Sequence, residues 1–343
     1  MVTMRAWRSA RTSHTVQLVE EERPAPARGE ILIEVIACGV CRTDLHVIDG
    51  DLDEHRPGVI PGHQVVGRIA GLGDGVPGLE VGDGAPGLEV GDLVGVAWLR
   101  STCGVCQWCR SGSENLCPVA RFTGWDFDGG FAEYMTAPAA YVYPLPADVD
   151  PVETAPLLCA GIIGYRALQR ANLPPGGRLG LYGYGSSAHL VAQMASAAGA
   201  QIYVVTRGDD NQALARTQKS TFVGDESAVP PEPLDAAIVF APAGPIVPQA
   251  LSATAPGGTV VLAGIHLSDI PALDYEASLF HERDLRSVTA NTRSDGDAFL
   301  RLARQLPLRP HVTTYSFSDV SVALDDLRAG RASGSLVIAT PRP

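Results

Sequence analysis

The sequence predicts an α/β protein of two domains: an irregular, mostly β domain and a doubly wound, parallel α/β domain. The 343 residues exceed what one hydrophobic core usually serves. Short apolar runs among many glycines and prolines extend to about residue 143, and from about residue 147 apolar strands alternate with helical segments. We expect the first domain to comprise residues 1–146 and 289–343, and the second to comprise residues 147–288.

The individual elements follow from the hydrophobic pattern. In the first domain, residues 31–36 and 93–98 are apolar runs of strand length. In the second, we expect helices and strands in this order: a helix at 157–170, a strand at 178–182, a helix at 187–198, and strands at 202–206, 236–240 and 259–263. Strands that alternate with helices indicate a parallel sheet. A helix at 297–305 and a strand at 335–339 form a tail that is expected to return to the first domain.

The composition is that of a globular protein in solution. Apolar residues make up 45%, and the formal net charge of -12 gives no reason to expect nucleic acid or an anionic membrane as a partner. No apolar stretch reaches the roughly 18 to 20 residues of a membrane span. Residues 1–10 lack the apolar core of a signal peptide. We therefore expect a cytoplasmic protein.

One short tandem duplication interrupts the first domain. Residues 75–83 (GVPGLEVGD) and 84–92 (GAPGLEVGD) match at eight of nine positions. The period is too short for a solenoid. Because loops tolerate insertions, we expect the duplication to form an exposed loop.

Four of the seven cysteines form a closely spaced cluster. Cys103, Cys106, Cys109 and Cys117 give the pattern C-x2-C-x2-C-x7-C. Four thiolates can close a tetrahedral shell around zinc, which stabilises a loop and leaves no position for chemistry. Disulfides and an iron–sulfur cluster are the alternatives, since closely spaced cysteines also open ferredoxin motifs. We expect a structural zinc.

A second set of potential metal ligands is dispersed along the chain. Cys41, His63 and Cys159 together supply two thiolates and one imidazole. A catalytic zinc takes three such protein ligands and keeps its fourth position open. Each residue taken singly also fits a packing or structural role, so spacing alone does not establish this site.

A glycine turn predicts a dinucleotide site. Gly183, Gly185 and Ala188 form G-x-G-x-x-A between a predicted strand and a predicted helix, where the backbone approaches a pyrophosphate. The next strand ends at Thr206 and Arg207 without the acidic residue that usually binds the ribose of NAD(H). Arg207 favours NADP(H), because a guanidinium pairs with a 2′-phosphate.

NAD(H) remains an alternative for the cofactor. Asp209 and Asp210 follow closely, and a loop can return one of them to the ribose. Arg207 would then be an exposed charge.

The motifs ACGVCRTDLH, IPGHQVVG, the four-cysteine cluster, DGGFAEY, PLLCAG and GYGSSA occur in one order along nearly the whole chain. In this order the sequence resembles the zinc-dependent medium-chain alcohol dehydrogenase family. The resemblance implies a GroES-like catalytic domain and a Rossmann cofactor domain. It further implies two Zn²⁺ per subunit, a homodimer or homotetramer, and reversible hydride transfer between NAD(P) and a primary aliphatic or aromatic alcohol or its aldehyde.

The resemblance also assigns roles near the second ligand set. Cys41, His63 and Cys159 match the catalytic-zinc ligands, so Cys38 becomes a packing residue. Thr43 matches the hydroxyl that touches the substrate oxygen, and His46 matches the outer end of a proton relay that passes through a ribose hydroxyl of the cofactor.

Further roles carry plainer alternatives. Asp44 matches the carboxylate that orients the ligand histidine, or else it caps a helix. Arg42 is a candidate contact to the cofactor phosphates, or an exposed charge. Trp98, Trp125 and Ile163 are candidates for the lining of a substrate cleft between the domains, with core packing as the alternative. Such a lining suggests small aliphatic or aromatic primary alcohols.

Gln64 departs from the family pattern, which has glutamate after the ligand histidine. Glutamine keeps the shape and removes one negative charge beside the metal. We expect Gln64→Glu to raise the pKa in the pH–rate profile.

Two other functions compete with an alcohol dehydrogenase. One is a zinc-free quinone or enone reductase, which would lack both sets of metal ligands. The other is a non-catalytic, zinc-stabilised redox-sensing protein, which would have no use for Thr43 and His46 as a relay.

Overall fold

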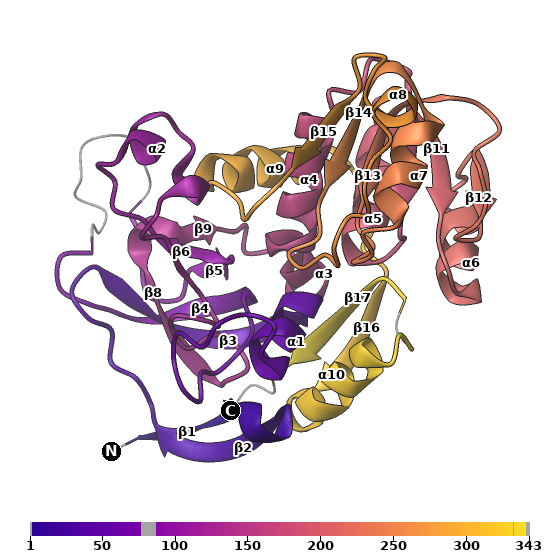
Figure 1. Ribbon diagram of the computed structural model, residues 1–343. Helices are drawn as coiled ribbons and strands as arrows, with labels where there is room; N and C mark the ends of the chain where they lie inside the picture. Colours follow the sequence, from indigo (N-terminus) through magenta and orange to yellow (C-terminus); the bar gives the residue numbers. More distant parts are fainter. Residues whose placement is uncertain (1, 77–86, 332, 341–343) are drawn as a thin grey trace. The chain divides into compact units, whose positions relative to one another are not determined.

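The computed structural model describes residues 2–76, 87–331 and 333–340, and it divides into two compact units (Figure 1). The first unit comprises Met1–Cys159, Asn291–Asp297 and Val312–Pro343. The second comprises Ala160–Ala290 and Ala298–His311. The fold class is the expected α/β class with one mostly β unit and one doubly wound unit.

The division differs from the expected one over residues 147–159, 289–290 and 298–311. The first stretch packs on strands of the first unit, so it belongs there although it precedes a helix of the second. In the last stretch, the ring of Phe299 approaches so closely that an alanine Cβ at position 161 would lie 2.4 Å from it. This contact ties Phe299 to the second unit.

The first unit is built on a seven-stranded sheet of order β16-β17-β3-β4-β5-β9, with β8 also paired to β3. Its strands, including two small separate pairs, are β1 (Thr3–Ala10), β2 (Thr15–Glu22), β3 (Glu30–Val40), β4 (Gln64–Leu72), β5 (Leu93–Val96), β6 (Leu99–Ser101), β7 (Arg121–Phe122), β8 (Tyr134–Pro138), β9 (Val142–Pro144), β16 (Val312–Ser316) and β17 (Ser335–Ala339). The predicted return of the tail is confirmed, because β17 lies antiparallel to β3 with Ala339 opposite Ala37.

The first unit also contains short helices. They are α1 (Arg42–Asp49), α2 (Gln107–Arg110), α3 (Pro151–Thr154) and α10 (Val320–Arg328), with 3-10 turns η1 (Arg11–Ser13), η2 (Glu114–Leu116), η3 (Ala139–Tyr141), η4 (Ala155–Leu158) and η5 (Phe317–Asp319). Helix α9 (Arg293–Gln305) begins in the first unit and ends in the second.

The second unit is a six-stranded, wholly parallel sheet of order β12-β11-β10-β13-β14-β15, which confirms the doubly wound prediction. Its strands are β10 (Arg178–Tyr182), β11 (Gln201–Val205), β12 (Phe222–Gly224), β13 (Leu234–Val239), β14 (Thr254–Leu262) and β15 (Asp284–Ser287). Its helices are α4 (Ala160–Ala171), α5 (Ser186–Ala197), α6 (Asp209–Thr217), α7 (Ile246–Ala253) and α8 (Tyr275–Ser278). Among the described residues, no helix is both long and apolar enough to cross a membrane.

The single helix expected at 157–170 is wrong in one respect. A 3-10 turn, η4, ends at Leu158, and α4 begins only at Ala160. Cys159 between them has φ -132° and ψ -67°, outside the helical region. Apolar periodicity continued through this break because both segments are buried. Residues 77–86, most of the tandem duplication, lie outside the described residues, so its loop conformation stays a prediction.

His189 on α5 is an uncharged histidine in the core of the second unit. Its side chain is fully buried, with Nδ1 3.0 Å from the carbonyl of Gly185, and Nε2 accepts from the amide of His311 at 3.1 Å. Burial lowers the pKa of His189 to about 4.

This buried histidine predicts a loss of stability in mild acid. Between pH 6.5, where the unfolded chain begins to bind a proton at this residue, and pH 4, the native state stays neutral, so stability falls as pH falls. Each pH unit in that window costs about 1.4 kcal/mol, for a total of about 3 kcal/mol. Urea unfolding of His189→Gln and the unmodified chain across this window should show a shallower decline for the variant. Equal slopes would contradict the assignment.

Candidate active site and metal centres

The first candidate centre lies where two neighbouring strands meet short helical turns. Cys41 directly follows β3 and caps α1, and His63 directly precedes β4, which pairs with β3 at Gly39 and Gln64. Cys159 directly follows η4, which packs on both strands. The sulfur atoms of the two cysteines and a ring nitrogen of His63 all lie within 4.8 Å of one another.

These three side chains suit a zinc ion in number and chemistry. Zn–S and Zn–N bonds at a tetrahedral angle place sulfur about 3.6 Å from nitrogen. The Sγ of Cys41 lies 3.2 Å from Nε2 of His63, a few tenths of an ångström closer. Two thiols and one imidazole leave a fourth position open, the arrangement found in catalytic zinc sites.

The three ligand side chains carry protons that a metal cation can displace. The pKa of Cys41 lies well below its usual value, because the Cys159 thiol donates to it and His63 adds positive charge, although burial opposes ionisation. The hydrogen bond to Cys41 and burial hold the pKa of Cys159 well above its usual value. Burial disfavours protonation of His63, but Cys41 and Asp44 outweigh it and raise its pKa to about 10. Metal binding at such a site releases protons.

Asp44 holds the two ligand-bearing segments together. Its Oδ2 accepts from the amide of Cys41 at 2.9 Å, and its Oδ1 accepts from the amide of Gly62 at 3.0 Å. The same Oδ1 lies 3.1 Å from Nδ1 of His63. Asp44 is not the N-cap residue, which is Cys41, but as the third residue of the helix it closes the capping box on the amide of Cys41, so it has a helix-capping role as well. The geometry is that of a carboxylate that fixes the orientation of a ligand histidine.

Helix α1 also carries the two residues expected to move the proton. Thr43 and His46 are both buried, and at a spacing of three residues they share one helix face. Nδ1 of His46 lies 2.7 Å from Oδ2 of Asp51. Sequence reasoning missed Asp51, which lies beyond the end of the helix and belongs to no motif. Arg42, the first residue of α1, is exposed.

Gln64 and Cys38 lie behind the ligands. Gln64 is 2% exposed and packs on the opposing strand so tightly that an alanine Cβ at position 39 would lie 2.8 Å from its Cδ. Cys38 is fully buried and lies outside both cysteine-containing metal groups. Burial raises the pKa of its thiol well above the usual value, so Cys38 stays protonated and packs.

A stack of aromatic rings borders the centre. Trp98 meets His63 edge-on at 4.8 Å and stacks on Phe122 at 5.0 Å and on Trp125 at 5.8 Å. His55 continues the stack on Trp125 at 3.9 Å. The sequence suggested the two tryptophans, but Phe122 and His55 are in no motif and were missed. Ile163 lies on α4 in the second unit and is half-buried.

The four clustered cysteines form the second candidate centre. Their sulfur atoms lie within 4.8 Å of one another, with separations of 3.5 Å (Cys106–Cys109), 3.7 Å (Cys103–Cys117) and 3.9 Å (Cys103–Cys109). Thiolates about 2.3 Å from one ion at a tetrahedral angle are about 3.8 Å apart, so the four sulfurs fit a single zinc ion. A disulfide needs about 2.05 Å, and all four are free thiols.

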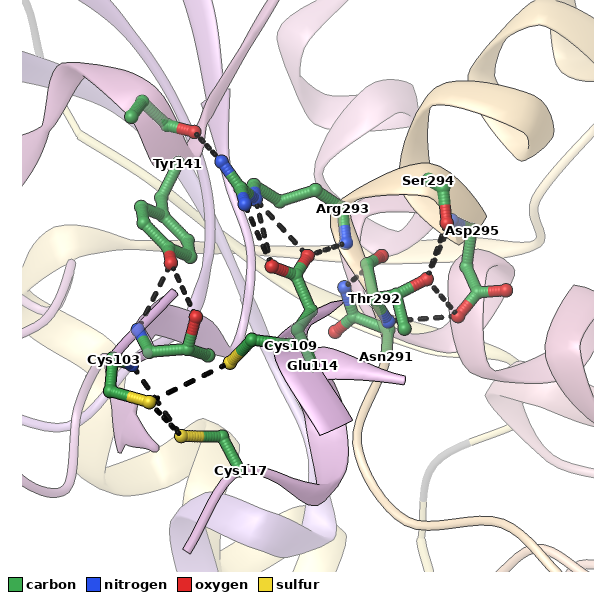
Figure 2. Close-up of polar contacts among 12 residues, drawn as sticks. Cys103, Cys109, Glu114, Cys117, Tyr141, Asn291, Thr292, Arg293, Ser294 and Asp295 are labelled. Carbon is green, nitrogen blue, oxygen red and sulfur yellow. Dashed lines mark hydrogen bonds and ion pairs between the residues drawn. The ribbon is translucent and has the colours of Figure 1, made fainter. Parts of the chain in front are cut away.

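An ion pair anchors the four-cysteine loop (Figure 2). The carboxylate of Glu114 accepts from the backbone amide and from Nη2 of Arg293, both at 2.8 Å. The guanidinium of Arg293 lies over the ring of Tyr141, whose hydroxyl accepts from the amide of Thr102 beside Cys103. Burial raises the pKa of Glu114, but the Arg293 hydrogen bonds outweigh it and hold that pKa below its usual value.

We expect Glu114→Gln to lower the free energy of unfolding by about 1 kcal/mol. Hydrogen bonds to a charged group contribute about 1.5–3 kcal/mol, and solvent screens this pair because the Arg293 side chain is 43% exposed. Metal should also leave the four cysteines faster, since η2 loses its anchor. Urea unfolding and the rate of metal transfer to a chelator measure the two effects. Glu226→Gln, at an exposed loop position, is the control, and equal results for both variants would contradict the anchoring role.

The glycine turn has the form expected of a dinucleotide site. Gly183 has φ +87°, and an alanine Cβ there would lie 2.9 Å from the amide nitrogen of Ala241. An alanine Cβ at position 185 would meet open space, and within the described residues no side chain caps the start of α5. Ala188 is fully buried. Bare helix N-termini of this kind bind phosphate groups.

The residue after β11 is hydrogen-bonded to the glycine turn. Oγ1 of Thr206 accepts from the amide of Tyr184 at 3.1 Å. Arg207 is exposed next to it, and Gly208 at φ +84° starts α6. Asp209 and Asp210 lie in the first turn of that helix and are exposed.

Comparisons with known proteins identify the family. Residues 27–147 match the alcohol dehydrogenase GroES-like domain, and residues 188–305 match the zinc-binding dehydrogenase family. The chain is 52% identical to the probable alcohol dehydrogenase AdhA of Mycobacterium tuberculosis over 340 residues, which covers 98% of this chain and 97% of that protein.

Solved structures agree on the fold. A cobalt- and zinc-bound thermostable alcohol dehydrogenase from Pyrobaculum aerophilum has a TM-score of 0.83 and 26% identity, covering 98% of this chain and all of that one. CAD from Helicobacter pylori, solved with NADP(H), has a TM-score of 0.87 at 22% identity over 98% of both chains. The chain belongs to the zinc-dependent medium-chain alcohol dehydrogenase family and is an oxidoreductase of the alcohol dehydrogenase type.

Proposed function

We propose that this chain is a zinc-dependent, NADP(H)-linked dehydrogenase that interconverts small primary alcohols and aldehydes. The observation that carries the proposal is the convergence of Cys41, His63 and Cys159, with the carboxylate of Asp44 behind the histidine. A zinc ion held there would act as a Lewis acid on the substrate oxygen. The four-cysteine loop supports a second, purely structural ion.

The residues of the site divide the remaining tasks. Asp44 fixes the orientation and tautomer of His63 through Nδ1, which keeps Nε2 available as a ligand. The Thr43 hydroxyl takes the proton from an alcohol or returns it to an aldehyde oxygen. His46, whose Nδ1 lies 2.7 Å from Oδ2 of Asp51, exchanges that proton with solvent. Trp98 and Trp125 supply flat apolar surface, which favours aromatic or small aliphatic substrates.

The choice of cofactor rests on two neighbouring residues. Gly183 and Gly185 leave room for a pyrophosphate at the start of α5, and a bound nicotinamide cofactor would carry the hydride. At the end of β11, Thr206 replaces the ribose-binding acid, and Arg207 is exposed and able to pair with a 2′-phosphate. The aspartates beyond it lie on α6.

Initial rates of benzaldehyde and acetaldehyde reduction with NADPH and with NADH test the proposal. We expect turnover with both aldehydes and a higher kcat/KM for NADPH. Preference for NADH would overturn the role of Arg207 and leave the reaction class intact. Turnover with neither cofactor, in protein that carries two zinc ions per chain, would overturn the activity itself.

A further inference from the structure

The segment of residues 51–56, between α1 and β4, holds one ring of the aromatic stack. The indole nitrogen Nε1 of Trp125 donates to the backbone carbonyl of Asp53 at 2.8 Å. Two residues further along, the ring of His55 lies almost parallel to the same indole, with centroids 3.9 Å apart and an interplanar angle of 13°. One short segment therefore holds Trp125 both at its nitrogen and on a ring face.

A buried carboxylate holds His55 in this position. The side chain of Asp126 is 3% exposed, and its Oδ1 lies 2.9 Å from Nδ1 of His55. Its Oδ2 accepts from the amide of Phe122 at 2.8 Å, and Nη1 of Arg121 donates to Oδ1 at 2.8 Å. Arg121 and Phe122 form β7, so the ring of His55 is tied to the strand that carries part of the stack.

The stack joins this exposed segment to a ligand residue of the first candidate centre. Trp125 lies 5.8 Å from Trp98 at an interplanar angle of 9°, and Trp98 meets His63 edge-on at 4.8 Å. Trp98 and His63 are buried, Trp125 is half-buried and His55 is exposed. Trp125 is therefore the tryptophan of the stack that leaves more of its surface open to a substrate ring.

We propose that His55 is a positioning residue that fixes the plane of Trp125 and thereby gives the site its preference for aromatic over small aliphatic aldehydes. The inference rests on the proposed function. Aromatic pairs gain free energy only in particular relative orientations. Because His55 restricts the indole before a substrate arrives, less free energy is lost in ordering that ring on binding. A two-carbon aldehyde has no ring to pack there.

The reduction of benzaldehyde and of acetaldehyde by the full chain measures this preference. In His55→Ala we expect the KM for benzaldehyde to rise about five-fold, the equivalent of one aromatic pair. The kcat should change by less than about two-fold, because the contact to Trp125 is equally strong in the bound substrate and in the transition state. Both constants for acetaldehyde should stay within about two-fold of those of the unmodified chain.

Two further variants separate stacking from a general disturbance of the segment. His55→Phe keeps a ring on Trp125 without the bond to Asp126, and should restore the KM for benzaldehyde to within about two-fold of that of the unmodified chain. Glu54→Ala is the matched control, because Glu54 is the exposed neighbour of His55, and it should leave both KM values unchanged. A benzaldehyde KM that stays unchanged in His55→Ala, rises equally in Glu54→Ala, or is not restored in His55→Phe would overturn the positioning role.

The indole N–H of Trp125 reports on the same contact without turnover. Its NMR signal is assigned by its loss in Trp125→Phe. In His55→Ala the proton should exchange with solvent about five-fold faster, because the bond to Asp53 opens more often. An unchanged exchange rate would overturn the claim that His55 holds the ring. The absence of turnover with both aldehydes in the unmodified chain would instead overturn the proposed function, and the aromatic preference with it.

Discussion

Replacing Cys41 by serine is expected to lower kcat/KM for benzaldehyde reduction by about 10³-fold or more. Serine is a good helix cap, so the hydrogen bond from the amide of Thr43 and the start of α1 should survive. The thiolate ligand is lost. Lewis-acid stabilisation contributes several kcal/mol, and each 1.4 kcal/mol is a factor of ten in rate. Steady-state rates together with the metal content of the purified variant measure the effect.

Cys38→Ser is the matched control, three residues earlier on the same strand–helix junction. Its thiol is fully buried, packs beside Gly62 and Gly130, and lies outside both metal groups. The variant should lose some stability and keep its metal and its kcat. A large loss of kcat in Cys38→Ser, or near-normal turnover in Cys41→Ser, would show that the wrong cysteine has been assigned.

Replacing Arg207 by aspartate should raise the KM for NADPH by about 30- to 100-fold and bring the KM for NADH down. Hydrogen bonds to a charged group contribute about 1.5–3 kcal/mol, the new carboxylate repels the 2′-phosphate, and an aspartate at the end of β11 restores the ribose-binding acid. Initial rates over a range of each cofactor concentration, at fixed benzaldehyde and fixed ionic strength, give both constants.

Arg216→Asp controls for the change in net charge, because Arg216 is an exposed arginine further along α6. It should leave both constants within about two-fold, since exposed charges farther apart than a Debye length are screened. If Arg207→Asp behaves like Arg216→Asp, Arg207 is an exposed charge and does not bind a phosphate.

The local elements of this fold could be predicted because each carries its own signal. The strands at 178–182 and 335–339 have the expected bounds, since each is a short apolar run between turn-forming residues: Gly177 and Gly183 flank the first, and Gly334 precedes the second. The segments that carry Cys41 and His63 could be matched to motifs, but the sequence did not give the distance between the two side chains. That distance depends on the pairing of β3 with β4.

Long-range partners had no signal in the sequence. Glu114 and Arg293 are 179 residues apart, and nothing near either residue indicates the other. Asp51 follows His46 by five residues. Residues at that spacing meet only when a turn lies between them, so the sequence did not indicate this contact. The boundary between the two units also depends on packing, because η4 is as apolar as the helix that follows it.

One missed feature did have a signal. Helix α9 begins at Arg293, four residues before the expected start at 297. Thr292 and Asp295 form reciprocal side-chain bonds to each other's amides, at 3.1 Å and 2.8 Å. The pattern T-x-x-D before an amphipathic segment is a helix-start motif, so the true beginning could have been predicted.

We propose that turnover needs a metal held by Cys41, His63 and Cys159. The most direct measurement removes metal with a chelator and follows the zinc content and the rate of NADPH-dependent benzaldehyde reduction on the same samples. The zinc content of Cys41→Ser gives the amount of metal that the four-cysteine cluster holds. We expect the rate to fall in proportion to the zinc above that level and to return when Zn²⁺ is added. A rate that persists in protein stripped to that level would contradict it.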